Sequence, residues 1–254
     1  MVLTISSQNT EAGDISMIDN AGRSAVLAIT APVKANTAIG PQTIAFGEAV
    51  AGFSRDAMTQ AGRLLPEALN AHLLSTASAV LAGPFRAVQA AAIKEDQARR
   101  AAEARLLETP NDTASVAIRA EHRGVLRTLD HATLPTAINS ADLLRLQAIL
   151  ELPDGFPSQF VDMARDRAMR LAHIQKSGLQ ADYALKPDAN DPLAHGPDAA
   201  AAERAADAAL ATHRQRSETI DLTRNMLREA IHFVAVAGGV DQDRAFAALT
   251  GAAA

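Results

Sequence analysis

The stretch AAAAERAADAALATHRQRSETIDLTRNMLREAIHFVAV, residues 199–236, is the longest uninterrupted helical pattern in the chain. Alanine, leucine, glutamate and arginine dominate it, and these residues are strong helix formers. A straight helix over this range would extend for about 55 Å at 1.5 Å per residue. Gly238 and Gly239 follow and predict its end, and residues 241–249 are expected to form a short last helix.

One face of this long helix carries apolar residues at helical spacing: Leu210, Ile220, Leu227, Ile231 and Val234. His213 and Ser217 lie on the same stripe, so the pattern is not a continuous coiled-coil seam. We expect an interrupted face of this kind to suit the groove of a partner better than a closed core.

The residues before this helix form a linker. Pro187, Pro192 and Pro197 are interleaved with Asp, Asn and Gly over residues 186–198. A helix cannot cross three prolines, because each removes a backbone donor and clashes with the preceding turn. The sequence therefore predicts a Pro-rich linker at 186–198 and a C-terminal helical segment at 199–254.

Residues 46–185 are predicted to form a helical body. Breaks or kinks are expected at Pro66 and at Pro84. Thr109 and Pro110 should stop one helix, and Asp112 or Thr113 can cap the next. Ser140 is expected to cap a further helix with Asp142 in its first turn, after which the turn 153–155 leads into another.

Residues 1–45 differ from the rest of the chain. They are rich in Thr, Ser, Asn and Gly, and their short apolar runs at 2–5 and 25–29 are broken by glycine and proline. This composition predicts an extended N-terminal arm or short strands rather than helix. A pair of such strands is marginal in water, so we expect the arm to be held by the chain's own body or by a partner.

The composition supports a mainly α fold, a helical bundle with an extended N-terminal arm and a long C-terminal helix after the linker. The chain holds 57 alanines in 254 residues, whereas aromatic residues make up 3%. A core of alanine and leucine indicates helices packed closely through small side chains. This pattern argues against a β-sandwich, a barrel or a typical α/β enzyme.

Charge and cysteine content exclude several classes of function. The net charge is −5 and the pI about 5.8, whereas a duplex-binding domain usually has a pI above about 9, so no dedicated nucleic-acid site is expected. The chain has no cysteine, so thiolate catalysis, disulfides and Fe–S clusters are excluded. We find no signal peptide and no ordinary transmembrane run, and expect a cytoplasmic protein or one in a virion assembled there.

Catalytic signatures are sparse. The sequence contains no Walker-type phosphate loop, no dinucleotide-binding glycine motif, no G-x-S-x-G and no H-E-x-x-H. Glu229-x-x-His232 has the spacing that di-iron helical proteins use, but they use it twice and add two further glutamates. We therefore expect no catalytic residue, no metal and no cofactor. A soluble helical metalloenzyme of the ferritin-like type, using Glu229 and His232, is the alternative.

Four small residues spaced by four, Ala71, Ser75, Ala79 and Gly83, form a stripe that would let another helix approach closely. The first interpretation is a buried helix inside a soluble bundle. A role in membrane contact or in oligomer formation is the alternative, although the run is too short and too polar at its ends to span a bilayer alone.

Two segments carry a resemblance. In residues 117–130 an Arg-x-x-Leu-Arg pattern ends at Arg127, and residues 140–154 contain Asp-Leu-Leu and Ala-Ile-Leu before a Pro turn. These segments resemble Ala-rich helical virion-associated proteins of tailed bacteriophages and phage-like elements. The resemblance covers about 60 residues, and the residue types that carry it are common ones. It implies a virion-associated or assembly role and points to no catalytic residue.

These observations favour a non-enzymatic structural or assembly protein, with an internal or ejected component of a phage particle as the specific case. Its partners are expected to be proteins, in a homo-oligomer or a larger assembly. The metalloenzyme and a cytosolic helical adaptor are the alternatives.

Overall fold

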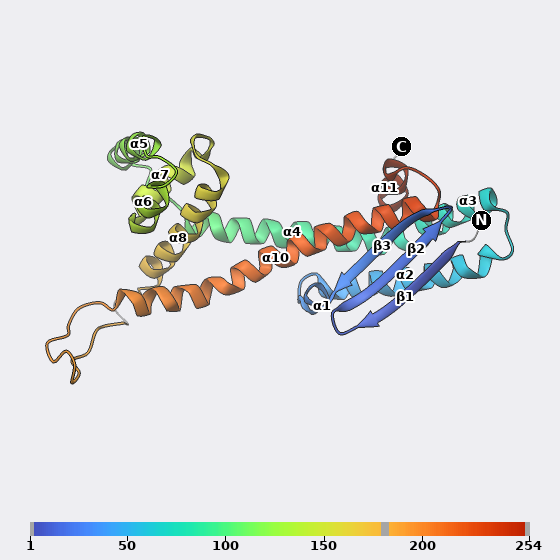
Figure 1. Ribbon diagram of the computed structural model, residues 1–254, viewed down its shortest axis with the longest axis horizontal. Helices are drawn as coiled ribbons and strands as arrows, with labels where there is room; N and C mark the ends of the chain where they lie inside the picture. Colours follow the sequence, from blue (N-terminus) through green and yellow to red (C-terminus); the bar gives the residue numbers. More distant parts are fainter. Residues whose placement is uncertain (1–2, 179–182, 252–254) are drawn as a thin grey trace. The chain divides into compact units, whose positions relative to one another are not determined.

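The computed structural model describes residues 3–178 and 183–251 and is mainly helical, with a small three-stranded antiparallel sheet at the N-terminal side (Figure 1). The chain divides into two compact units. The first contains Met1–Ala98 and Arg216–Ala254, and the second contains Arg99–Gln215. These divisions fall inside two long helices.

Three strands form a meander in the order β1 (Thr4–Thr10), β2 (Gly13–Asn20) and β3 (Arg23–Thr30). Thr10 pairs with Gly13 and Asn20 pairs with Arg23, so each connection is a two-residue turn. In the second turn Ala21 and Gly22 have φ values of 60° and 77°. Positive φ at both central positions is the geometry that follows the right-handed twist of the strands.

The sheet has one buried and one exposed face, as alternation along a strand requires. Ile18, Leu27 and Ile29 are buried in the core of the first unit, whereas Met17 and Val26 are exposed on the other face. The N-terminal segment is thus a folded sheet held by its own unit. Of the two expected forms, short strands are confirmed for residues 4–30 and a free extended arm is not, because the buried face finds apolar partners within the chain.

Helices begin earlier than residue 46, the start expected for the helical body. α1 (Ala31–Ala35) and α2 (Gly40–Ala61) each have a proline in the first turn, Pro32 and Pro41. Proline suits this place because the first backbone N–H groups of a helix have no partner within it. These two prolines therefore start helices rather than interrupt an arm.

Residues 66–106 form one continuous helical run made of α3 (Pro66–Thr76), the π-helical turn η1 (Ala77–Leu81) and α4 (Ala82–Leu106). The break expected at Pro66 is confirmed, since α3 begins there. The break expected at Pro84 is absent. Instead the wider turn η1 precedes this proline, in keeping with the association of irregular turns with proline in long helices.

The long helix α10 (Ala199–Ala237) and the short helix α11 (Gln242–Thr250) confirm the helices predicted over residues 199–236 and 241–249. Phe233 of α10 packs edge-on against Phe53 of α2, with ring centroids 6.2 Å apart. Gly239 follows α10 with a φ of 62°, and a Cβ there would lie 2.5 Å from the side-chain amide nitrogen of Asn70. Glycine is therefore required for this close approach of the chain to α3.

The second unit contains α5 (Thr113–Arg127), α6 (Leu134–Ser140), α7 (Leu143–Glu151), the 3-10 turn η2 (Pro153–Gly155) and α8 (Ser158–Ser177), together with the end of α4 and the start of α10. Asp112 caps α5 as predicted, accepting a hydrogen bond from Ser115 N at 2.9 Å. The cap of α7 is Asp142, whereas the sequence favoured Ser140. Ser140 instead ends α6.

A buried arginine joins α5 to α7. The Arg119 side chain is 1% exposed and donates to Pro110 O at 2.8 Å and to a Glu151 carboxylate oxygen at 3.4 Å. Arg123 donates to the same carboxylate. The hydrogen bonds from Arg123 and then Arg119 hold the pKa of Glu151 below its ordinary value. A buried arginine with these partners avoids the cost of an unpaired charge.

Ile149 of α7 is fully buried (0% exposed) in the core of the second unit, whereas Ile118 of α5 is 42% exposed. We expect Ile149→Asp to lower the free energy of unfolding by at least about 3 kcal/mol, because it buries an unpaired carboxylate. Ile118→Asp should cost less than about 1 kcal/mol. Urea denaturation of both variants checks this, and equal midpoints would contradict the assignment of the core face.

The expected linker lies in a segment without helix or extended strand. Residues 183–198 hold only the isolated bridge between Ala184 and Pro197, and Leu193 is 81% exposed. Exposed segments with little buried backbone are preferred sites of nicking. Brief digestion with subtilisin should therefore cut within residues 186–198 first, as read from fragment masses. An earlier cut inside α8 or α10 would contradict this.

Candidate functional site

The predicted stripe of small residues runs along α3, η1 and α4 and is exposed. Ala71, Ser75, Ala79 and Gly83 all lie on the solvent side. The opposite side of the same helices is buried in the core of the first unit through Leu73, Ala77, Leu81, Phe85 and Val88. The helices are therefore amphipathic, and the interpretation of the stripe as the buried side of a bundle helix is wrong.

The exposed stripe continues along α4 through Ala87 and Ala90. We call these six residues, Ala71, Ser75, Ala79, Gly83, Ala87 and Ala90, the small-residue face. Residues 68–93 contain a single residue of the charged types Asp, Glu, Lys and Arg, which is Arg86. A Cβ added at Gly83 would meet no atom within 4 Å, so the surface there is open.

The small-residue face runs at one end into a groove of about 620 Å³. α3 lines one wall with Asn70, Ala71, Leu74 and Ser75, and the other wall comes from Gly238, Val240 and α11. Ala71 and Ser75 therefore belong both to the exposed face and to the groove.

Over residues 3–178 and 183–251, no helix has both the length and the apolar character needed to cross a bilayer.

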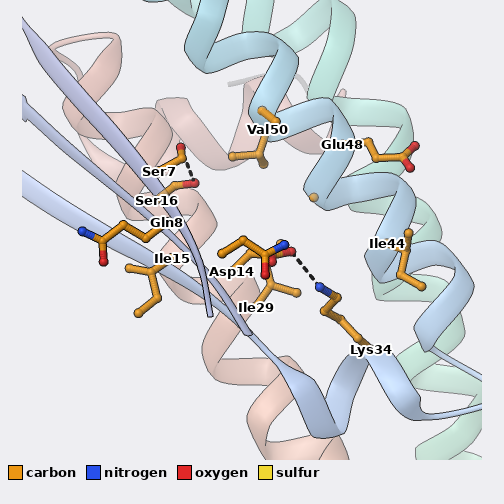
Figure 2. A pocket seen from close by; sticks show the side chains of 13 residues that line it. Ser7, Gln8, Asp14, Ile15, Ser16, Ile29, Lys34, Ile44, Glu48 and Val50 are labelled. Atoms are coloured by element: carbon orange, nitrogen blue, oxygen red, sulfur yellow. Dashed lines mark hydrogen bonds and ion pairs between the residues drawn. The ribbon is translucent and has the colours of Figure 1, made fainter. Parts of the chain in front are cut away.

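A second cavity, of about 400 Å³, lies between the sheet and α2 (Figure 2). Lys34 Nζ donates to Asp14 Oδ2 at 3.0 Å, and the hydroxyls of Ser7 and Ser16 are 3.2 Å apart. Val50 of α2 faces these groups. Four of the polar side chains are thus engaged in two pairs, and the lining includes no histidine that could act as a base beside a serine.

Glu229 and His232 do not converge on a common site. Glu229 Oε2 accepts the backbone N–H of Ala28 in β3 at 2.8 Å. His232 Nδ1 lies 3.3 Å from Gln242 Nε2. Among the described residues, no group of three or more His, Cys, Asp or Glu side chains is placed to hold a metal ion. The sequence spacing gave no sign that this glutamate accepts a backbone N–H at the edge of the sheet.

Comparisons with known proteins identified no relative of this chain. A scan against protein-family models found no match, and neither a curated protein nor a solved structure matched the chain significantly. The functional assignment therefore depends on the surface and the contacts of the chain itself.

The role of Glu229 can be tested by two substitutions. Glu229→Ala removes the acceptor for Ala28 N–H and should lower the free energy of unfolding by about 1–3 kcal/mol. Glu229→Gln keeps an acceptor oxygen at the same place and should cost clearly less. Thermal and urea denaturation measure both effects. Equal losses in the two variants would show that the charge of the carboxylate, and not its capping oxygen, is what matters.

Proposed function

We propose that this protein is a non-enzymatic structural subunit that associates with further copies of itself through the small-residue face. The observation that carries the proposal is the exposure of that face along α3, η1 and α4, with a single charged residue between Glu67 and Lys94.

The chemistry of the face suits contact between identical surfaces. Small side chains let two helix backbones approach closely, so that many weak dispersion contacts add up. A two-fold interface brings the same patch of both subunits together. Charged residues within it would lie close to identical charges of the other subunit and repel them. Between Glu67 and Lys94 only Arg86 carries a charge, so this repulsion is limited to one side chain in each subunit. Val80, which is 42% exposed beside Ala79, adds apolar surface to the contact.

The alternatives receive less support from the geometry. In the cavity beside α2, Lys34 is paired with Asp14 and Ser7 with Ser16, and Glu229 accepts a backbone N–H at the edge of β3. The adaptor alternative uses the same exposed face and differs only in the identity of the partner. Self-association is favoured because the six small residues carry no charge, so they complement a second copy without a matched partner charge.

The more specific proposal, that the assembly is a phage particle, rests on the resemblance of residues 117–130 and 140–154 alone. In the second unit these segments supply the buried Leu126 and Ile149 and the arginines that pair with Glu151. Such roles belong to the interior of any helical unit. We retain the virion as the expected location and keep it separate from the evidence for self-association.

Ala79→Arg tests the small-residue face. An arginine at its centre would be desolvated without a partner, so the dissociation constant for self-association should rise at least about tenfold, which corresponds to about 1.4 kcal/mol. Sedimentation velocity over a concentration series measures this. The control is Ala102→Arg, at an exposed position farther along α4, where the constant should change less than about twofold.

Both variants should keep the fold, because arginine is nearly as good a helix former as alanine. A wild-type chain that stays monomeric at all concentrations would overturn the proposal. Equal weakening by the two substitutions would show that bulk charge and not the small-residue face controls association.

A further inference from the structure

The turns of the sheet determine which backbone groups of β1 face outward. Thr10 and Gly13 flank a two-residue turn and so exchange hydrogen bonds, after which bonded and non-bonded pairs alternate along the ladder. Ile5, Ser7 and Asn9 fall in the non-bonded pairs. Their backbone N–H and C=O groups therefore point away from β2.

The same rule applied to the second turn places Ala28 among the outward residues of β3, because Asn20 and Arg23 form the bonded pair. This assignment agrees with the observed hydrogen bond, in which Ala28 donates its N–H to Glu229 of α10. Arg23 also donates to Val240 O at 3.1 Å. The β3 edge is thus tied to the C-terminal end of the chain.

The β1 edge differs. No described residue forms a hydrogen bond with the outward backbone groups of Ile5, Ser7 and Asn9. Every residue of β1 except Ile5 is exposed. Figure 1 shows β1 at the outer side of the sheet.

The sequence of β1 also lacks the usual protection of an edge strand. Proteins blunt exposed edges with lysine, proline, bulges or a covering segment. Thr4–Thr10 reads TISSQNT, without a charge or a proline, and its register with β2 runs from Thr4 to Thr10 without a bulge. One edge of this sheet is capped and the other is open, which is the arrangement that accepts an additional strand.

We propose that β1 pairs antiparallel with β1 of a second copy of this chain, about a two-fold axis near Ser7. Ser7 then lies opposite Ser7 of the other copy, and Ile5 opposite Asn9, so that the outward N–H and C=O groups satisfy one another and the two sheets become one. A second copy is the favoured occupant because an uncharged strand meets no like charge when it pairs with itself. This inference rests on the proposed self-association and assigns it a second surface.

Ser7→Pro tests the inference on the full chain. Proline removes the outward N–H of Ser7 and is tolerated on an edge strand where that N–H faces solvent. The dissociation constant measured by sedimentation velocity should rise at least about tenfold. The matched control is Val26→Pro, which removes an outward N–H from the β3 edge and should leave the constant within about twofold.

Amide hydrogen exchange of the wild-type chain gives a readout that needs no substitution. The amides of Ile5, Ser7 and Asn9 should exchange at least about tenfold more slowly in concentrated than in dilute protein, because pairing protects them. The amide of Val26 should not change. This comparison decides the question even if Ser7→Pro fails to fold.

The outcomes separate this inference from the proposed function. Oligomers that Ala79→Arg dissociates, but whose β1 amides exchange at the same rate at all concentrations, overturn the inference and leave the small-residue face in place. Oligomers that Ser7→Pro dissociates and Ala79→Arg does not support the β1 edge and overturn the small-residue face. A chain that is monomeric at all concentrations overturns both.

Discussion

The contact between the N-terminal sheet and the last turns of α10 is the interaction on which the first unit depends. The sheet is too small to be stable alone, since three short strands need an apolar layer to cover one face. α10 contributes Phe233 and Val234 to that layer, while Asn20 of β2 donates to Val236 O at 3.1 Å. Apolar burial supplies most of the stabilisation, and the polar contacts fix the position of the sheet against the helix.

The sequence predicts elements whose signals are local and misses those that depend on distant contacts. The long helix, its glycine end and the Asp112 cap could all be read from neighbouring residues. The sheet could not be distinguished from an arm, although Ile18, Leu27 and Ile29 fall on one face once the strands are known. Whether such a face is covered depends on α2 and α10, and nothing in residues 1–45 reports their position.

The candidate surface shows the same limit. The four-residue spacing of Ala71, Ser75, Ala79 and Gly83 was visible in the sequence, but spacing does not say which side of a helix faces the core. Leu73, Leu81 and Phe85 have more apolar surface to bury than the small residues, so they take the inner side and leave the stripe outside. Glu229 is a similar case, because its partner Ala28 is 201 residues away along the chain.

The division of the chain has a consequence for the order of folding during synthesis. The second unit, residues 99–215, is contiguous, so it can form as soon as those residues have left the ribosome. The first unit needs residues 216–254 as well as 1–98, so the part of its sheet face that α10 covers stays exposed until residues 216–254 have also left the ribosome. During that interval the open strands are vulnerable to misassembly. Polar, serine-rich β1 keeps the nascent segment soluble, whereas a strand of alternating valine and isoleucine at the same place would promote aggregation.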